Sequence, residues 1–155
     1  AGTATAAGCQ LVASCDLAYA SSSAKFATPG VNIGLFCSTP MVAISRNLSN
    51  KHSMEMLLTG ELISSDKAAK IGLINDVIEI NELKDFVLDK AKKISKKSSI
   101  TLKIGKEAFY KQLDMKLSDA YDYASKVMVQ NMLKLDAKEG IDAFIDKREP
   151  NWKDK

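Results

Sequence analysis

A run of small residues at the start of the chain, Ala1 to Leu11, is the stretch most able to do chemistry. Its alanines and glycines predict a loop that turns into a helix, with the first turn close to another element. The first backbone N–H groups of a helix have no partner within it and carry a partial positive charge. With no bulky side chain in the way, they can approach a phosphate or a developing oxyanion. The alternative is a structural role, in which the small residues only let a neighbouring element pack closely.

The remaining reactive residues indicate neither a nucleotide loop nor a metal site. No lysine follows Gly8, so the stretch is not a phosphate loop of the GxxxxGK[ST] type. Cys9, Cys15 and Cys37 lack the CxxC spacing of metal ligands, and their odd number favours a reducing, intracellular setting. A catalytic Cys–His pair would have to use His52, the only histidine. Buried, inert cysteines and an exposed histidine at a helix start are the simpler interpretation.

The composition is that of an ordinary globular protein. The length of 155 residues is enough for one domain with a hydrophobic core. Of these residues, 46% are hydrophobic and 26% are charged, as in ordinary globular proteins. No apolar run approaches the ~20 residues of a membrane span, and a net charge of +3 does not by itself indicate nucleic acid. The lysines over 90–97 are expected to form a solvated helix face; an RNA- or phosphate-binding strip is the alternative, weakened by the lack of interleaved aromatic residues. We expect neither a membrane nor a nucleic acid as partner.

The sequence begins within a structural motif instead of before one. The chain opens on Ala1 instead of methionine, and no strand is evident before the small-residue turn. We therefore expect a fragment of a longer protein, from which no targeting segment can be read.

Short strands and short helices are expected to follow the turn. They are, in chain order, strands at 15–20 and 25–28, a turn at 29–30, a loop over 31–39, a short buried helix over 40–48, a helix over 52–58, a helix over 64–71 and a strand over 73–78. Pro40 resembles a proline at the first helical position. Ser64 is expected to cap its helix, with Asp66 in the first turn and Gly72 at the end.

The rest of the sequence is predicted to be helical. Asn81 is expected to cap a helix with one apolar face, formed by Leu83, Phe86, Val87, Ala91 and Ile94. Two helices follow, and the second carries a stripe of Tyr and Met side chains that we assign to the core or to a subunit contact. A last amphipathic helix covers 138–148 and stops before Pro150.

Four motifs stand in an order that is specific. They are Ala6-Ala7-Gly8-Cys9-Gln10-Leu11 with Cys15-Asp16; Phe26-Ala27-Thr28-Pro29 with Gly34; Met54-Glu55-Met56-Leu57-Leu58-Thr59-Gly60 with Ile63-Ser64 and Ala68-Ala69-Lys70-Ile71-Gly72-Leu73; and Glu139-Gly140-Ile141-Asp142-Ala143-Phe144 with Lys147-Arg148. Together they resemble the C-terminal portion of the crotonase superfamily, the enoyl-CoA hydratase/isomerase family. Among its members, the sequence is most similar to the enoyl-CoA-hydratase-domain-containing proteins associated with mitochondria.

The resemblance implies an α/β fold with the family's crotonase (ClpP-like) spiral of ββα turns and a C-terminal helical trimerisation region. Residues 1–78 would be the C-terminal part of the spiral core, and residues 79–155 the helical region. It also implies a homotrimer or hexamer that binds an acyl-CoA or enoyl-CoA thioester. No metal and no cofactor beyond the coenzyme A of that thioester are implied, and the setting would be the mitochondrial matrix or the cytoplasm.

The resemblance further implies an oxyanion hole made by two backbone N–H groups that hold the thioester oxygen. Ala7 matches the second donor, and a backbone donor works equally well from alanine or glycine. Ala6 and Gly8 complete the small-residue turn expected to contact the thioester. The first donor would belong to a segment that precedes residue 1.

The family's acid–base residues are replaced in this chain. Hydratases of the family use two glutamates, and the matching positions here are Gln10 and Gly30. A carboxamide can orient water but does not accept a proton at neutral pH. The acid of the family's dienoyl isomerases would fall near Ser38. Because each missing acid or base costs about 10²–10⁴-fold in rate, efficient hydration is not expected. A gain of hydratase activity in a Gln10→Glu, Gly30→Glu variant would support the idea that only the acid–base pair is missing.

Two positions near the C-terminus match family positions that approach the CoA of a neighbouring subunit. They are Phe144 and Lys147, the lysine towards the CoA phosphates. The leading hypothesis is an enoyl-CoA hydratase/isomerase-like protein that binds an acyl-CoA and polarises its thioester, with slow thioester hydrolysis as one reaction left to it. A catalytically silent acyl-CoA-binding or assembly protein is the alternative, so enzymatic activity is left open.

Overall fold

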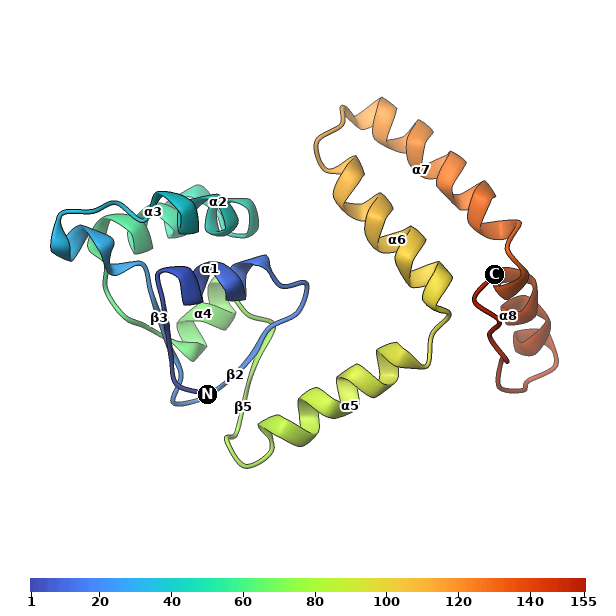
Figure 1. The fold of residues 1–155 in the computed structure, drawn as a ribbon, viewed down its shortest axis with the longest axis horizontal. Coiled ribbons are helices and arrows are strands. Elements are labelled where there is room, and N and C mark those ends of the chain that lie inside the picture. The colour runs from blue at the N-terminus through green and yellow to red at the C-terminus, as the bar shows by residue number, and fades with distance from the viewer. The chain divides into compact units, whose positions relative to one another are not determined.

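The computed structural model describes residues 1–155 and divides them into two compact units, Ala1–Asp89 and Lys90–Lys155 (Figure 1). All strands lie in unit 1, and the last of them ends at Ile78. Helix α5, Leu83–Ser95, contains the boundary between the units. No helix is both long and apolar enough to cross a membrane.

Two small sheets form the base of unit 1. The first contains β1 (Thr3–Thr5), β3 (Lys25–Ala27) and β4 (Ile63–Ser64), in the order β1-β3-β4. β1 and β3 are parallel, whereas β4 is antiparallel to β3. The second sheet pairs β2 (Tyr19–Ser21) with β5 (Asp76–Ile78) in parallel. Parallel strands separated by helices are typical of the α/β class, as expected.

β1 corrects the expectation that no strand precedes the small-residue turn. Its sequence, Thr-Ala-Thr, is too short to show a period, and its partner β3 lies more than twenty positions away along the chain. Likewise, only the end of the strand expected over 73–78 is extended. Leu73 and Ile74 instead donate their N–H groups to the Ala68 carbonyl oxygen, which closes the turn after α4.

Helices cover these strands. They are α1 (Ala7–Ser14), a 3-10 helix (Pro29–Ile33), α2 (Ser38–Asn47), α3 (Asn50–Thr59) and α4 (Ser65–Ile71). Ser64 caps α4 by accepting the Lys67 N–H, and Gly72 ends it with a φ of 87°, which confirms the predicted cap and terminator. Gly60 ends α3 in the same left-handed conformation. Glycine is favoured at both ends because a side chain is strained at positive φ.

The region before and within α2 differs from expectation. Part of the expected loop over 31–39 is the 3-10 helix, and Pro40 is the third residue of α2 instead of the first. The helix is amphipathic rather than buried throughout, because only Pro40 and Ile44 are buried within it. Ile44 faces α1, and the Asn47 side chain binds the Ala13 carbonyl oxygen at the end of α1. α2 therefore clamps α1 onto the sheet.

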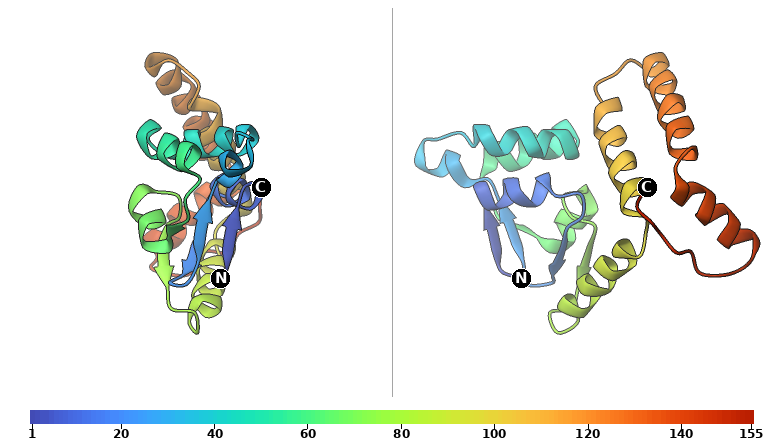
Figure 2. Two further views of the ribbon diagram at one scale, coloured as in Figure 1. Left: turned by 90° about the vertical axis from the view of Figure 1, so that its left-hand side faces the viewer. Right: turned by 45° about the vertical axis from the view of Figure 1, so that its right-hand side comes forward.

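Unit 2 consists of helices with little buried surface. They are α6 (Ser99–Gln112), α7 (Leu117–Met132) and α8 (Leu135–Ile145), and α6 and α7 form an antiparallel pair (Figure 2). Tyr121 and Met128 of α7 are 69% and 62% exposed. The stripe was predicted to lie in the core or at a subunit contact, and within this chain it does not lie in the core. Contact with another subunit stays a prediction. α5 begins at Leu83, two residues after Asn81, so Asn81 is not at the position of the predicted cap. No residue of α5 is buried.

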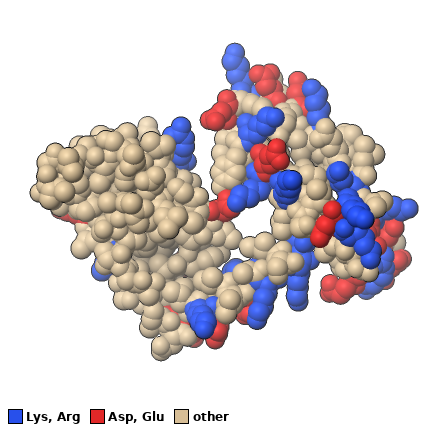
Figure 3. Space-filling model, viewed as in Figure 1, with Lys and Arg blue, Asp and Glu red and all other residues tan.

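Charge is distributed unevenly along the chain. Residues 1–45 contain only Asp16 and Lys25 as charged side chains, whereas residues 79–155 are rich in both signs. In the view of Figure 3, the visible face of unit 1 is almost free of Lys, Arg, Asp and Glu. A surface with so little charge is typical of contact regions.

The α1–α2 contact is expected to be a main source of stability in unit 1. Ile44 is fully buried, so Ile44→Ala leaves a cavity and is expected to lower the free energy of unfolding by about 2–5 kcal/mol. Val42→Ala, on the exposed side of the same helix, is the matched control and is expected to change it by less than about 1 kcal/mol. Urea denaturation followed by circular dichroism measures both, and equal losses would contradict the described packing.

Candidate functional site

Helix α1 starts where two parallel strands end. β1 and β3 pair with Thr5 opposite Ala27, and the chain passes through Ala6 directly into α1. The Ala6 N–H continues the pairing by donating to the Ala27 carbonyl oxygen at 3.0 Å. Ligand sites of α/β proteins usually lie at the carboxyl ends of parallel strands. The small-residue turn thus lies at the edge of the sheet where a site is expected.

Ala6 has a backbone conformation that side chains rarely adopt. Its φ is 47° and its ψ is −113°. Such a conformation costs on the order of 1–3 kcal/mol for a residue with a Cβ, and it persists where the surroundings fix it. Strain of this kind is concentrated at functional sites. Here it turns the chain sharply from β1 into the first turn of α1.

The first N–H groups of α1 are available to a ligand. Ala7 and Gly8 are exposed, and neither donates its N–H to an acceptor in the chain. The first intrahelical bond is made by Gln10, which donates to the Ala6 carbonyl oxygen at 2.9 Å. Two free donors at the positive end of a helix can bind a carbonyl oxygen on which negative charge develops.

No acid or base accompanies these donors on α1. The first turn contains no acidic residue, and Cys9 is the only titratable group of the helix. Burial, together with the nearby Cys37, raises the pKa of the Cys9 thiol to about 11, so it is neutral and a poor nucleophile at neutral pH. Gln10 is half-buried, and its side-chain amide makes no hydrogen bond within the chain. It can offer hydrogen bonds but no proton transfer.

His52 lies in the first turn of α3, as predicted. Its Nδ1 is 3.7 Å from Glu55 Oε2, and the side chain is 41% exposed. Its partner is thus a carboxylate one turn along the same helix. All three cysteines are free, and no group of three or more metal-ligating side chains is present.

The backbone around Gly30, the position predicted to match the family's second glutamate, is tightly packed. The Gly30 N–H donates to Cys37 Sγ at 3.3 Å, and its carbonyl oxygen accepts the Leu35 N–H at 2.9 Å. An added Cβ would lie 2.6 Å from the Leu35 carbonyl oxygen and 2.9 Å from Cys37 Sγ. A glutamate therefore cannot be added without moving the loop. In a Gln10→Glu, Gly30→Glu variant, the second substitution therefore also requires the loop to move.

Ser38 offers no acid in place of the missing carboxylates. It is the exposed first residue of α2, and its hydroxyl donates to the Phe36 carbonyl oxygen at 3.3 Å. Ala6, Ala7, Gly8 and Gln10 are thus together at one helix start, while Gly30 lies in the 3-10 helix and Ser38 begins α2. No carboxylate stands at any of the three expected positions.

Phe144 and Lys147 stand at the exposed end of α8 in unit 2. Phe144 is 84% exposed in the last turn. Lys147 follows the helix with a φ of 54°, and its N–H donates to the Phe144 carbonyl oxygen. The structure thus places both predicted residues, exposed, at the same end of α8.

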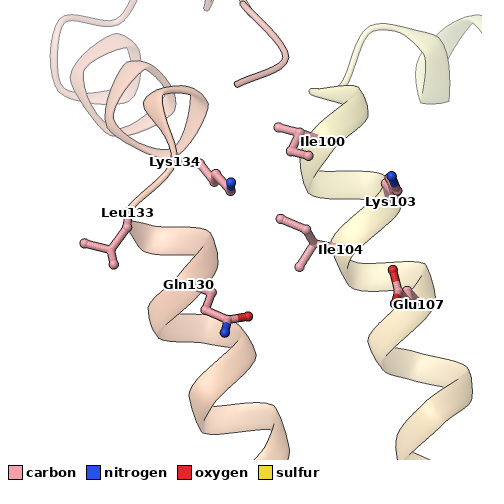
Figure 4. A pocket seen from close by; sticks show the side chains of 7 residues that line it. All are labelled: Ile100, Lys103, Ile104, Glu107, Gln130, Leu133 and Lys134. Atoms are coloured by element: carbon pink, nitrogen blue, oxygen red, sulfur yellow. The ribbon is translucent and has the colours of Figure 1, made fainter.

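Three cavities have walls that include none of the predicted residues at the start of α1. One of about 390 Å³ in unit 1 has an apolar wall that includes Leu11, Val12 and Phe26, but none of the predicted site residues. Another, of about 470 Å³, lies between α6 and α7, where Ile100 and Ile104 point towards α7 (Figure 4). The remaining side chains that line it are Lys103, Glu107, Gln130, Leu133 and Lys134.

A third cavity contains residues that the sequence did not single out. It has about 400 Å³, lies in unit 2 and is lined by Phe144, Trp152, Asn131 and Asp136, among others. Asn131 Oδ1 is buried there without a hydrogen-bond partner. Asp136 is 1% exposed, an unusual state for a carboxylate. Its sequence context, an acidic residue in the first turn of a helix, gives no signal of that burial.

Comparisons with known proteins are consistent across sequence and structure. The sequence profile of the Enoyl-CoA hydratase/isomerase family matches residues 1–155. The mitochondrial enoyl-CoA hydratase domain-containing protein 3 of Rattus norvegicus is 54% identical over 151 residues, which are 97% of this chain and 50% of that protein. The chain therefore spans about half the length of the curated relatives it matches.

Two solved structures superpose closely on the chain. The human enoyl coenzyme A hydratase domain-containing protein 3 has a TM-score of 0.95 and 51% identity, over 97% of this chain and 60% of that one. An enoyl-CoA hydratase of Mycobacterium smegmatis has a TM-score of 0.95 and 48% identity, over 97% of this chain and 59% of that one. The fold is the crotonase fold, as the four motifs predict.

The strain at Ala6 is expected to be measurable. Ala6→Gly removes the Cβ that conflicts with a φ of 47°, and is expected to raise the free energy of unfolding by about 1 kcal/mol. Ala4→Gly in β1, where φ is ordinary, is expected to lower it by about 0.5–1 kcal/mol. Urea denaturation compares the two, and a loss at both positions would show that the turn is unstrained.

The closed loop at Gly30 gives a prediction of opposite sign. Gly30→Ala forces a Cβ against a backbone oxygen and is expected to lower the free energy of unfolding by about 1–3 kcal/mol. Gly105→Ala, in the open surroundings of α6, is expected to raise it by up to about 1 kcal/mol. Urea denaturation measures both variants. Equal changes in the free energy of unfolding would mean that the backbone around Gly30 accommodates the added Cβ.

Proposed function

Because the chain belongs to the enoyl-CoA hydratase/isomerase family, we propose that it binds an acyl-CoA thioester and polarises the thioester carbonyl through the Ala7 N–H. The observation that carries this proposal is the unpaired, exposed N–H at the start of α1, at the end of the β1–β3 pairing. Charge that gathers on a thioester oxygen would meet a fixed donor and the positive end of a helix. Ala6 and Gly8 leave the approach open.

Efficient hydration of an enoyl-CoA is not part of the proposal. Gln10 can orient water, but it cannot take its proton, and the loop around Gly30 leaves no room for an acid. The alternative function, a catalytically silent acyl-CoA-binding or assembly protein, is favoured by that closed loop. Both functions use the same oxygen-binding donor, so binding comes before activity in testing them.

The remaining parts of the proposal concern the setting. Phe144 and Lys147 would contact the CoA moiety of a neighbouring subunit, with the lysine near a phosphate. The exposed apolar stripe of α7 supports assembly into a homotrimer or hexamer. The curated relatives are named mitochondrial, which supports a mitochondrial location.

A binding experiment tests the thioester contact. Titration calorimetry is expected to show that a saturated acyl-CoA binds about three- to tenfold more tightly than CoA itself, since the thioester oxygen gains one hydrogen bond. The infrared band of the bound thioester carbonyl is expected to move to lower wavenumber. Loss of enoyl-CoA absorbance is expected to be at least about 10²-fold slower than the usual 1–10³ s⁻¹. Turnover at ordinary rates would refute both functions as stated.

A proline at position 7 removes the donor alone. Proline is accepted at the first helical position but restricts the residue before it, so Ala7→Pro is made together with Ala6→Gly, and Ala6→Gly alone is the control. We expect the double variant to lose the carbonyl shift and the preference for acyl-CoA over CoA. An unchanged shift, with the helical circular dichroism preserved, would place the thioester oxygen elsewhere.

A further inference from the structure

The last residues of the chain fold back along α8. Residues 151–155, here called the strap, contain Trp152, the only tryptophan. Its indole Nε1 donates to the Lys96 carbonyl oxygen at 2.8 Å. Its ring lies against Gly140 of α8, where an added Cβ would stand 3.2 Å from the ring. The strap therefore ties α8 to the chain just before α6.

A buried carboxylate on α8 holds the strap. Asp136 Oδ1 accepts the Lys153 N–H at 2.7 Å, and Oδ2 accepts the Asp154 N–H at 3.1 Å. The Ser98 side chain is a third hydrogen-bond partner, ahead of α6. Burial by itself raises the pKa of Asp136, but these three hydrogen bonds outweigh burial and hold the pKa below its ordinary value. The carboxylate is therefore ionised at neutral pH.

The same contacts cap α6. Asp154 Oδ1 accepts the Ser99 N–H at 2.8 Å, and Ser98 Oγ accepts the Thr101 N–H at 3.3 Å. Both N–H groups belong to the first turn of α6, where no intrahelical carbonyl is available. Because Asp136 binds both Ser98 and the Asp154 backbone, it is connected to both caps.

One turn further along α8, Glu139 fixes the other end of the returning chain. Arg148 donates to both of its carboxylate oxygens, at 2.6 and 3.1 Å, and the Asn151 N–H donates to Oε1 at 2.7 Å. The hydrogen bonds from Arg148 and then Asn151 lower the pKa of Glu139 to about 2. Arg148 of this ion pair directly follows Lys147, whose φ is 54°.

We propose that Asp136 is a positioning residue: its carboxylate, by holding the strap, fixes α8 against the start of α6 and so sets how Phe144 and Lys147 meet a ligand. Trp152 of the strap and Phe144 line the same cavity of about 400 Å³, so moving the strap changes the surroundings of Phe144. The ligand part of this inference rests on the proposed acyl-CoA function.

The pH dependence has a defined sign. Glu139, one turn along α8, is the charged group that acts on Asp136 through its charge, and Lys97 lines the same cavity. Lys153 and Asp154 of the strap contact Asp136 through their backbone N–H groups. Because the pKa of Asp136 in the folded chain is below its ordinary value of 3.8, its hold on the strap is complete above that pH. It is lost as the pH falls through the lowered value.

Fluorescence and hydrogen exchange test the strap directly. Asp136→Asn keeps the size of the side chain and removes its charge, and Asp142→Asn removes the same charge from the same helix as a control. At pH 7 we expect the Trp152 emission of Asp136→Asn at longer wavelength, and exchange at the Ser99 and Thr101 amides about tenfold faster. Asp142→Asn is expected to behave as the wild type. The unmodified chain, which needs no variant, is expected to show the same emission change only in acid below pH 3.8.

Calorimetry with an acyl-CoA then separates this inference from the proposed function. Binding about tenfold weaker in Asp136→Asn than in the wild type and Asp142→Asn supports it. Wild-type emission and exchange in Asp136→Asn overturn it, and faster exchange with unchanged affinity overturns the positioning of the ligand contacts. If the wild-type chain binds no acyl-CoA, both the proposed function and the proposed positioning of Phe144 and Lys147 for a ligand are overturned. The exchange data still decide in that case whether Asp136 holds the strap.

Discussion

The hydrogen bond from the Ala6 N–H to the Ala27 carbonyl oxygen is the constraint on which the helix start depends. It extends the parallel β1–β3 pairing by one residue and holds Ala6 at a φ of 47°. The resulting sharp turn leaves the Ala7 N–H without a partner and facing solvent. Such a strained residue persists because the sheet fixes the chain before it, and the packing of α1 against α2 fixes the helix after it.

The features that could be predicted from the sequence are those determined by residues close together in the chain. The Ser64 cap, the glycine terminators and the small-residue helix start depend on neighbouring residues, and the four motifs correctly indicated the crotonase fold. β1 was not predicted because three residues are too few to show an alternating hydrophobic pattern, and its partner strand β3 is distant in the sequence. Periodicity located the face of α7 but could not say what covers it. The role of Asp136 depends on the strap, which only tertiary structure reveals.

The candidate site separates two tasks that enzymes of thioester chemistry often combine. Stabilising charge on an oxygen needs only fixed dipoles, and a helix start supplies them without any ionisable side chain. Moving protons needs groups with suitable pKa values, and α1 carries none, since its only titratable side chain is a neutral thiol. The proposed function uses only the first of these tasks, because the start of α1 offers backbone donors and no acid or base.

The packing around Gly30 makes a change from glycine to glutamate at this position costly. A single codon change would place a side chain against the Leu35 carbonyl oxygen and Cys37 Sγ, so the first step back is penalised before any activity returns. A glutamate at position 30 requires the surrounding loop to change at the same time. As long as this packing persists, position 30 offers no side chain to a ligand.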